Sequence, residues 1–545
     1  MLIKFLFTLI FGLAIFLRFW DLDNIPPSLN WDEVSLGYNA YSIFKTGKDE
    51  WGELLPLTFR SYGDYKLPAY VYLDIPFIAL FGLNEWGVRL PSAVLGIGSV
   101  LVTFLILKSL VNIKVALWGA FIASILPWTI ILSRIALEAQ LALFLTTLGV
   151  YFFLKALQEK SYLAVSFICF GLTIFTYNAS RIVTPLLVLI LVVLYRGELL
   201  KIKQIAGVSL FIFILISIVA LPKALLQDSS ARYRWTHLLD EGAINRINEQ
   251  RGSSDLPPFL SRLSNNKVTY FLTESSKNYI SHYSPDFLFV KGGSNYQFSV
   301  PRSGLVYPAL APFIILGFWS IFKQRKKWQL FILAWFFIAP IPAAITRDSP
   351  HALRSIMMVL PLLMIITQGI SYCFNDLNHW IKKNEAMLSF VVAATLFISL
   401  YTFWQNYSGS YVKNYSWSWQ FGYKQVVRYV VREGEKYDKI YVTKKYGEPH
   451  EFLLFYLKYD PKQYIEGENL IRYERSDWFW VDRFDKFAFI NDWEVMENVK
   501  CQMSNVKCLL ITSPDNYPLG SKPIHTINFL DGQKAFDIVI LPQVQ

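Results

Sequence analysis

Long apolar segments recur along the first 404 residues and are separated by short polar loops. Most are close to the roughly 20 residues that an α-helix needs to cross the hydrocarbon core of a bilayer. Charged residues make up 17% of the chain, whereas soluble globular domains carry about 25%. We therefore expect an α-helical polytopic membrane protein with about eleven membrane-spanning helices. They are predicted at residues 5–20, 89–107, 115–132, 139–154, 161–177, 183–195, 205–222, 305–322, 328–345, 355–373 and 386–404.

Two segments near the N-terminus need separate treatment. No small-residue cleavage site follows the segment 5–20, so we interpret it as a retained span and not as a signal peptide. The segment 67–83 is apolar but short, and it contains Asp74 and two prolines. It is either a span or a helix that lies in the membrane interface. The choice sets the orientation of every later segment.

The distribution of charge favours one of these alternatives, because cytoplasmic loops are enriched in Lys and Arg. If 67–83 does not cross, the loops on the side of the N-terminus hold about fourteen basic and about four acidic residues, a bias typical of cytoplasmic loops. If it crosses, the basic loops are divided between both faces. We therefore expect an interfacial helix and a cytoplasmic N-terminus. The outer face then receives residues 21–88, 133–138, 178–182, 223–304, 346–354 and 405–545.

The tail has a different pattern from the apolar segments. Helical patterns over 423–432 and 451–459 are interleaved with strand-like runs at 439–444, 507–513 and 536–542. Helices that alternate with strands indicate a small α/β domain. We therefore expect a transmembrane domain over 1–404, with large outer loops at 21–88 and 223–304, followed by an extracytoplasmic α/β domain over 405–545.

The net charge and the cysteines do not point to a particular chemical activity. The net charge of +11 raises the question of nucleic-acid binding, but the basic residues are spread over short loops and form no single patch, so we expect no nucleic acid. Cys501 and Cys508 either form a disulfide or remain two free thiols, whereas Cys169 and Cys373 lie in apolar runs. The sequence contains neither zinc-ligand spacing nor a phosphate-binding glycine loop.

The loop 21–66 carries the most informative polar residues. Asp32 and Glu33 are adjacent carboxylates that follow a proline-rich turn and open a helical pattern. The simplest role for Asp32 is an N-cap, because its carboxylate would accept a backbone N–H bond. A capping carboxylate at a membrane surface can also face a cavity and act on a substrate, so the two roles are compatible.

Further ionisable residues fall on the same predicted face of the membrane. Charged groups near membrane depth are costly and therefore tend to line cavities or pathways, although interfacial snorkelling explains any single arginine as simply. A collection on one face favours a functional site. Its members are Lys66, Arg89, Arg134, Glu138, Tyr177, Arg181, Arg347, Asp348, His351 and Arg354.

This set suits group transfer from a lipid-phosphate donor. Arg and Lys can bind the anionic phosphate, and a phosphate leaving group needs positive charge but no general acid. A carboxylate near the attacked carbon can serve as base for the acceptor. Such a reaction requires no glycine-rich nucleotide site.

At these residues the sequence resembles the GT-C superfamily of membrane glycosyltransferases. The branch concerned includes protein O-mannosyltransferases and the bacterial aminoarabinose transferases that modify lipid A. The motif WDEVSLGYNAYSIF is similar to the first-loop motif of that family, DYKLPAYVYL to its Lys-Pro segment, EWGVRLPSAVLG to the opening of its second span and SRIALEA to its second outer loop. The resemblance is good over about residues 1–200. The family commonly has two prolines after the lysine, where this chain has Leu67-Pro68, and Asp at the position of Glu138.

The resemblance implies a role for each matched residue. Asp32 takes the catalytic carboxylate position, with Glu33 beside it, and Glu138 the second acidic position. Lys66 contacts the phosphate of the donor, with Arg89, Arg134, Arg181, His351 and Arg354 as further phosphate-binding candidates. Glu138 orients Asp32, binds the acceptor, or binds a divalent metal together with Asp32. Because members of the superfamily differ in metal dependence, no cofactor is assigned beyond the polyprenyl-phosphate-linked sugar that serves as donor substrate.

The first hypothesis is therefore an inverting glycosyltransferase with Asp32 as base. Its partners are a lipid-linked sugar donor, membrane lipid and an extracytoplasmic protein, lipid or glycan acceptor. The alternatives are a lipid or solute transporter, for which the sequence lacks paired broken helices and a repeated half, and an O-antigen ligase or polymerase-type enzyme, against which the long first loop argues. We expect the chain in a bacterial plasma membrane.

Overall fold

The computed structural model describes residues 1–542 except 224–235, 378, 476–477, 499–500 and 502–505. The chain divides into two compact units. The first contains residues 1–18, 94–133 and 137–404, and the second contains residues 19–93, 134–136 and 405–545. The second unit thus joins the first predicted outer loop, a piece of the second outer loop and the tail.

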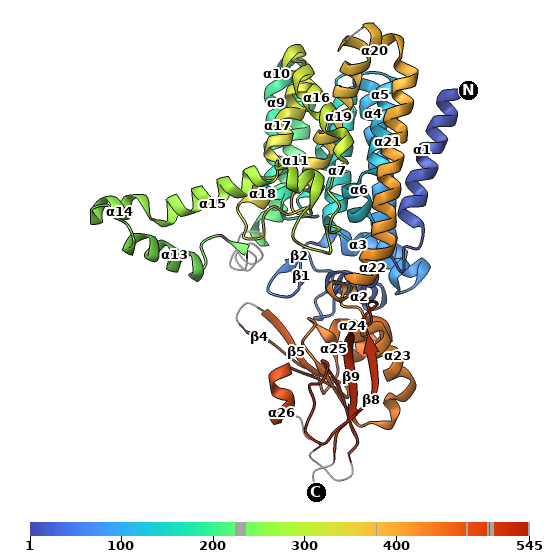
Figure 1. Ribbon diagram of the computed structural model, residues 1–545, viewed down its shortest axis with the longest axis vertical. Coiled ribbons are helices and arrows are strands. Elements are labelled where there is room, and N and C mark those ends of the chain that lie inside the picture. Colours follow the sequence, from blue (N-terminus) through green and yellow to red (C-terminus); the bar gives the residue numbers. More distant parts are fainter. Residues whose placement is uncertain (224–235, 378, 476–477, 499–500, 502–505, 543–545) are drawn as a thin grey trace. The chain divides into compact units, whose positions relative to one another are not determined.

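The regular secondary structure of the first unit, within its described residues, consists of helices joined by irregular loops (Figure 1). Its helices are α1 (Leu2–Phe19), α4 (Glu85–Leu110), α5 (Ile113–Ile125), α6 (Pro127–Ser133), α7 (Glu138–Ala156), α8 (Tyr162–Thr173), α9 (Ser180–Leu194), α10 (Arg196–Lys201), α11 (Lys203–Lys223), α13 (Glu241–Gly252), α14 (Pro258–Ser264), α15 (Lys267–Ser281), α16 (Ala311–Gln324), α17 (Lys327–Ile338), α18 (Ile341–Ala344), α19 (Val359–Tyr372), α20 (His379–Lys383) and α21 (Glu385–Gln405). The first residues of α4 and the ends of α1 and α21 belong to the second unit.

All eleven predicted spans coincide with helices. Among the described residues, seven helices are long and apolar enough to cross a membrane, or eight if α5 and α6, bent by 57°, form one span. The remaining three predicted spans correspond to shorter apolar helices, which are α8, α9 and the segment Pro308–Gln324. The eleven crossings therefore remain a prediction, although the helices themselves are confirmed. The segment predicted to lie in the interface forms α3 (Pro68–Phe81), with Pro76 inside it.

Close helix packing in the first unit depends on small residues. A Cβ on Gly317 of α16 would lie 2.1 Å from the carbonyl oxygen of Ile365, and one on Gly369 of α19 would lie 1.8 Å from that of Phe313. Glycine at both positions lets the two helix backbones approach, as in many membrane helix pairs. Helices α13, α14 and α15, from the large predicted outer loop, project away from the other helices of this unit (Figure 1).

The tail folds around a seven-stranded mixed sheet. Its strands are β3 (Lys439–Thr443), β4 (Ile471–Arg475), β5 (Trp478–Phe484), β6 (Phe487–Ile490), β7 (Cys508–Thr512), β8 (Pro523–Asn528) and β9 (Lys534–Ile540), in the order β4-β5-β6-β3-β7-β9-β8. The central strand β3 pairs in parallel with β6 and β7, and the outer pairs are antiparallel. The associated helices are α22 (Val412–Asn414), α23 (Tyr423–Glu433), α24 (Pro449–Leu457), α25 (Pro461–Ile465) and α26 (Val495–Asn498).

The predicted α/β character of the tail is confirmed. All three predicted strands and both predicted helices form, with shifts of at most two residues at their ends. Helices α23 and α24 pack together through stacked, fully buried rings of Tyr423 and Phe452, 4.3 Å apart. Strands β4, β5, β6 and β8 were not predicted.

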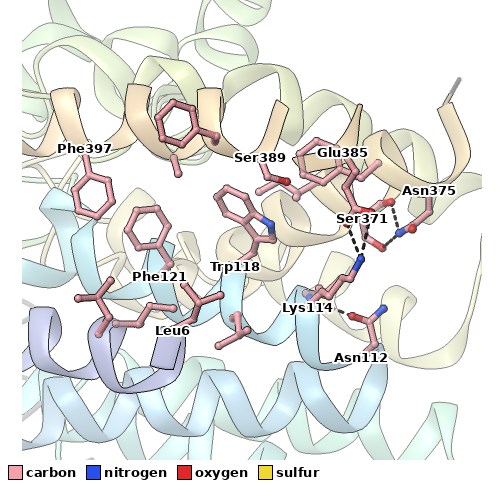
Figure 2. Close-up of a pocket in the computed structure, with 18 of the residues that line it drawn as sticks. Leu6, Asn112, Lys114, Trp118, Phe121, Ser371, Asn375, Glu385, Ser389 and Phe397 are labelled. Carbon is pink, nitrogen blue, oxygen red and sulfur yellow. Dashed lines mark hydrogen bonds and ion pairs between the residues drawn. The ribbon is translucent and has the colours of Figure 1, made fainter. Parts of the chain in front are cut away.

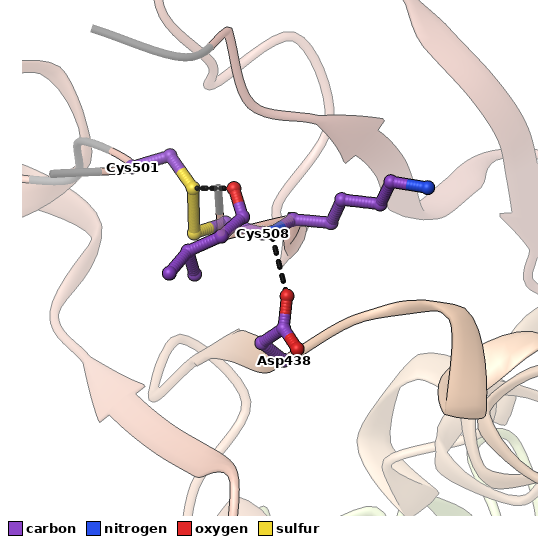
Figure 3. The surroundings of a disulfide bond; sticks show 5 residues. Asp438, Cys501 and Cys508 are labelled. Atoms are coloured by element: carbon purple, nitrogen blue, oxygen red, sulfur yellow. Dashed lines mark hydrogen bonds between the residues drawn. A yellow bond between two sulfur atoms is a disulfide. The ribbon is translucent and has the colours of Figure 1, made fainter. Parts of the chain in front are cut away.

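Cys501 and Cys508 form a disulfide next to the core of this sheet (Figure 3). Both cysteines are buried in an apolar cluster that includes Leu510 and Val539. Of the two open alternatives, the structure supports the bond. A disulfide is typical of proteins that fold outside the reducing cytosol, which is consistent with the predicted extracytoplasmic side of the tail.

Several contacts join the first loop to the tail within the second unit. Helix α2 (Trp31–Thr46) packs against α24, where Gly37 leaves no room for a Cβ because Phe455 would lie 2.8 Å away. The Arg472 guanidinium donates to the carbonyl oxygens of Glu50 and Trp51 at 2.8 and 3.0 Å. The first loop and the tail therefore pack into one body, as expected if both lie on the same predicted face of the membrane.

Candidate active site

The local fold around Asp32 differs from the N-cap interpretation. Asn30 is the N-cap of α2, and its side chain accepts a bond from the Glu33 backbone N–H at 2.9 Å. The Glu33 side chain accepts in return from the Asn30 N–H at 3.1 Å, which completes a capping box. The expectation that Asp32 caps the helix is therefore wrong. Asp32 lies two positions beyond the cap, as the second residue of the helix, and its side chain is 36% exposed.

Glu33 has a different environment from its neighbour. Its side chain is fully buried and accepts bonds from Arg89 Nε at 2.9 Å, from Arg89 Nη2 at 3.1 Å and from the Ala136 backbone N–H at 3.0 Å. The Arg89 guanidinium is also fully buried, and it donates to the carbonyl oxygens of Leu22 and Pro26 at 3.0 and 2.9 Å. This pair links α2, α4 and the turn before α2.

Arg134 has a similar structural environment. Its guanidinium is fully buried and donates to the carbonyl oxygens of Trp20, Asp21 and Ile25. Arg89 and Arg134 thus bind successive carbonyl groups of the irregular segment between α1 and α2. Buried carbonyl groups require hydrogen-bond donors, and here two arginines supply them. Neither guanidinium reaches the protein surface.

Lys66 and Asp32, two of the predicted site residues, lie side by side. Lys66 ends the two-stranded ribbon of β1 (Phe59–Arg60) and β2 (Tyr65–Lys66), which pair antiparallel. Its Nζ atom forms an ion pair with Asp32 Oδ1. Lys66 is 9% exposed, and its Nζ lies 5.8 Å from the centre of the Tyr62 ring. A half-exposed carboxylate and a largely buried ammonium therefore form the polar centre of this loop.

The tail adds residues that the sequence analysis did not identify. The hydroxyl of Tyr62, in the turn between β1 and β2, donates to Glu451 Oε1 at 3.1 Å and lies 3.0 Å from the carbonyl oxygen of Trp31. The Trp31 backbone N–H donates to Gln420 Oε1 at 3.0 Å. The sole signal in the sequence was the run Glu-Pro-His-Glu at 448–451, which opens α24.

The carboxyl groups of this run are perturbed by burial. Burial raises the pKa of Glu451 and of Glu448 to about 7. Burial, and then the Glu451 charge, raise the pKa of Glu50 well above its ordinary value. Burial lowers the pKa of His450 to about 3, so this imidazole is neutral at pH 7. Its approaches to Glu448 and Glu451, at 3.5 and 3.9 Å, are therefore not ion pairs at that pH.

The remaining predicted residues lie in the first unit. Arg354 donates to Thr346 Oγ1 at 2.7 Å and approaches Asp348 Oδ2 at 3.6 Å, with 15% of its side chain exposed. The backbone N–H of His351 donates to Nε2 of His282 at 3.3 Å. Burial lowers the pKa of His282 to about 4, so it accepts this bond as a neutral ring.

Arg181 and Glu138 occupy helix starts in the same unit. Arg181, in the first turn of α9, donates to Asn178 Oδ1 at 3.0 Å. Glu138 is the first residue of α7 and is half-buried. A metal held by Asp32 and Glu138 would need further ligands. Within the described residues, no group of three or more His, Cys, Asp or Glu side chains is arranged to hold a metal ion, so we derive no step through a metal.

A cavity of about 400 Å³ lies elsewhere in the first unit, between α1, α5, α19 and α21 (Figure 2). Its wall is mostly apolar, with Phe121 and Phe397 at one end. The other end is polar, where Lys114 Nζ bonds Glu385 at 3.0 Å. None of the predicted site residues lines this cavity.

Comparison with known proteins finds a family match over part of the chain and a similar fold over nearly all of it. Residues 8–234 match the family of dolichyl-phosphate-mannose-protein mannosyltransferases. The fold is similar to the crystal structure of ArnT from Cupriavidus metallidurans bound to undecaprenyl phosphate, with a TM-score of 0.57 and 13% sequence identity over 98% of this chain and 97% of that chain.

A second solved structure has a similar fold. It is the archaeal oligosaccharyltransferase AglB from Archaeoglobus fulgidus, in complex with an inhibitory peptide and a dolichol-phosphate. The TM-score is 0.51 at 14% identity, over 83% of this chain and 63% of that chain. No protein of curated function matches the sequence. At these identities the structural likeness shows the fold, and the family match is confined to residues 8–234, less than half of the chain. The resemblance to the GT-C superfamily is confirmed.

Proposed function

From the match of residues 8–234 to the mannosyltransferase family and the fold shared with ArnT, we propose that the chain is a GT-C glycosyltransferase that transfers a sugar from a polyprenyl-phosphate carrier to an acceptor outside the cytoplasm. The observation that carries the proposal is the ion pair of Asp32 and Lys66 at the start of α2. It places a carboxylate that can accept a proton beside a cation that can hold a phosphate. The two similar structures contain undecaprenyl phosphate and a dolichol-phosphate, which supports a carrier of this chemical class.

The proposed step is a single displacement at the anomeric carbon of the sugar. The acceptor hydroxyl or amine loses its proton to Asp32 as its oxygen or nitrogen bonds that carbon. The bond between the carbon and the phosphate oxygen breaks, and its electron pair leaves with the carrier phosphate. Attack opposite the leaving group inverts the configuration of the sugar. Lys66 stabilises the charge that develops on the phosphate.

The pairing of Lys66 with Asp32 suggests how donor binding prepares the site. Without donor, the ammonium is held by the carboxylate. An arriving phosphate competes for the same ammonium, because phosphate oxygens are strong acceptors. Once Lys66 binds the phosphate, the Asp32 oxygen that had been paired with Lys66 can accept the proton of the acceptor. Base and donor site are therefore coupled through one side chain.

Three predicted site residues receive a structural role in this proposal. Glu33, Arg89 and Arg134 are fully buried and bonded to protein groups, so we assign them to holding the segment before Asp32. We retain Arg354, His351 and Arg181 as candidates for the phosphate and Glu138 for the acceptor. The chain is placed in a bacterial plasma membrane, with the tail outside the cytoplasm.

Transfer by the purified protein in lipid tests the proposal. A panel of radiolabelled polyprenyl-phosphate sugars is offered together with peptide, lipid and glycan acceptors, with wild type beside Asp32→Asn. We expect wild type to release label from one carrier and Asp32→Asn to release none. Asp23→Asn, a matched change in the same loop, should retain activity. If no carrier is consumed by any variant, with or without added divalent metal, the transferase proposal fails and transport assays follow.

A further inference from the structure

Glu451 is a buried carboxyl group that the proposed mechanism does not use. It lies in the first turn of α24, in the tail, and is 1% exposed. Burying a carboxyl group costs free energy unless polar partners compensate. A second buried carboxyl, Glu50 of the first loop, adds to this cost, because like charges disfavour ionisation. Local stability therefore does not explain why a glutamate occupies this position.

The partner of Glu451 belongs to the first loop. Tyr62 donates its hydroxyl to Glu451 Oε1 at 3.1 Å. Tyr62 lies in the turn of the ribbon that ends at Lys66, and the Lys66 ammonium lies 5.8 Å from the centre of its ring. A cation near an aromatic face is attracted to it. A fixed Tyr62 ring therefore restricts where the Lys66 ammonium can lie.

The same hydroxyl also reaches the residue before Asp32. It lies 3.0 Å from the carbonyl oxygen of Trp31, and the Trp31 N–H donates to Gln420 of the tail. The Trp31 ring packs against Gly447 so closely that a Cβ there would lie 2.4 Å from it. Tail residues thus hold both backbone polar groups of Trp31, its N–H directly and its carbonyl oxygen through Tyr62.

We infer that Glu451 is a positioning residue of the Asp32–Lys66 site, which it holds in place through Tyr62, so that the site is completed by the C-terminal domain. This inference rests on the proposed function. Ionised Glu451 accepts the Tyr62 hydroxyl more strongly than the protonated form, because hydrogen bonds to charged acceptors are stronger. The order of the site should therefore depend on the charge of Glu451.

Charged and titratable groups surround Glu451 on every packed element. They are Glu448 and His450 on its own segment, Tyr62 and Lys66 from the ribbon, Tyr38 from α2, Glu50 from the loop after α2, and Tyr464 from α25. His450 is neutral because burial lowers its pKa to about 3. The burial-raised pKa of Glu451, about 7, predicts a kcat that rises with pH through neutrality.

The test compares the kcat and KM of wild type, Tyr62→Phe, Glu451→Gln and the double variant from pH 5.5 to 8.5. We expect each single variant to lower kcat roughly 10–100-fold, the range that small misplacements of reacting groups cause, with KM for the donor changed less than about threefold. Because Glu451 acts through Tyr62, the double variant should be no slower than the slower single variant. Glu451→Gln should also lose the rise near pH 7.

Glu448→Gln is the matched control, since Glu448 is equally buried on the same segment but bonds Trp478. It should keep the wild-type kcat at pH 8.5, with the rise displaced to lower pH because the Glu448 charge raises the pKa of Glu451. Equal losses of kcat in Glu448→Gln and Glu451→Gln, or additive losses in the double variant, would overturn the inference. The proposed function would still stand in that case, provided that wild type transfers sugar.

If wild type transfers no sugar, the proposed function fails, and structures of the variants still decide the inference. Separation of Lys66 from Asp32 in Glu451→Gln and in Tyr62→Phe supports it. An unchanged pair in both overturns it.

Discussion

The Glu33 carboxylate accepts two bonds from the Arg89 guanidinium, and both side chains are fully buried. Asp32, the preceding residue, is 36% exposed. Two adjacent carboxylates that look equivalent in the sequence therefore have opposite surroundings. The helical turn directs Glu33 inward to hold the fold and leaves Asp32 near the surface, where it pairs with Lys66.

Removing one partner of the buried pair should unfold the second unit. Leaving a buried charge without its partner typically costs about 3–5 kcal/mol, so we expect Glu33→Gln and Arg89→Met to reduce the yield of folded protein and its melting temperature. Arg89→Lys should not restore stability, because one ammonium cannot replace a guanidinium that bonds the carboxylate through two nitrogens and also reaches two carbonyls. Fluorescence-detected size-exclusion chromatography and thermal unfolding in detergent measure both effects. A melting temperature of Arg89→Met equal to that of wild type would contradict this role.

Binding of sugar-free polyprenyl phosphate separates the roles of Lys66 and Asp32. Lys66→Ala should weaken binding roughly 10–100-fold, because a charge-assisted hydrogen bond contributes about 1.5–3 kcal/mol. Asp32→Asn should bind the lipid as tightly as wild type or more tightly, since it removes a competitor for the ammonium. Titration in nanodiscs provides the affinities. Equal weakening by both substitutions would mean that the residues do not exchange partners.

The disulfide should stabilise the tail. Cys501 and Cys508 are seven residues apart in sequence, and closing so short a loop contributes about 2 kcal/mol in the chain-entropy description. We expect Cys501→Ser/Cys508→Ser to be cleaved faster by protease within residues 405–545 than wild type. Cys169→Ser serves as a control, because that cysteine is free and buried in α8. A cleavage rate equal to that of wild type would show that the bond adds no stability.

The buried glutamates and the neighbouring His450 should make the free energy of unfolding change with pH in opposite directions. The folded pKa of Glu451 and of Glu448, about 7, exceeds the ordinary 4.5, so their contribution to the free energy of unfolding is full below pH 4.5 and is lost as pH rises to 7. Relative to wild type, the melting temperature of Glu451→Gln should therefore rise over this range, by the equivalent of at most about 3 kcal/mol.

His450 supplies the control for that measurement. Its pKa falls from 6.5 to about 3 on burial, so its contribution is full above pH 6.5 and is lost as pH falls to 3. His450→Gln should gain stability relative to wild type as pH falls from 6.5. If all these variants follow wild type in parallel, the buried groups do not control the pH dependence of stability.

The predicted topology can be measured with single cysteines and a membrane-impermeant maleimide. Gln158→Cys lies in an exposed loop between α7 and α8, and Glu468→Cys in an exposed loop of the tail. We expect label at residue 468 in intact cells and at residue 158 only after permeabilisation. The reverse result would place the basic loops outside the cytoplasm, against the charge bias from which the orientation was predicted.

Much of the fold followed from the sequence because membrane helices are specified locally. Apolar length alone located the helices, and strand-like runs such as 439–444 located the centre of the tail sheet, where both faces are buried. Strand β4, by contrast, is mostly exposed and carries alternating charged residues. Such an edge strand lacks the apolar signal on which the predictions depended.

The site was predicted in part for a similar reason. Lys66 and Asp32 could be matched to short motifs, and the structure places them together. Glu451 could not be identified in this way, because its role depends on a contact with Tyr62, 389 residues away in sequence. The N-cap was misassigned because Asn30 and Asp32 are both good capping residues, and the reciprocal bond from Glu33 favours Asn30.

The contact between Tyr62 and Glu451 also has a consequence for biogenesis. The ribbon that carries Lys66 is translated early, whereas α24 is among the last elements made. At about 5–20 residues per second, the 389 residues between them correspond to roughly 20–80 s of synthesis. With the predicted topology, the first loop is outside the cytoplasm during that interval, before the segment proposed to complete it has been made. If Glu451 positions the site as proposed, nascent chains should not catalyse transfer, and we expect a chain truncated before residue 451 to be inserted but inactive.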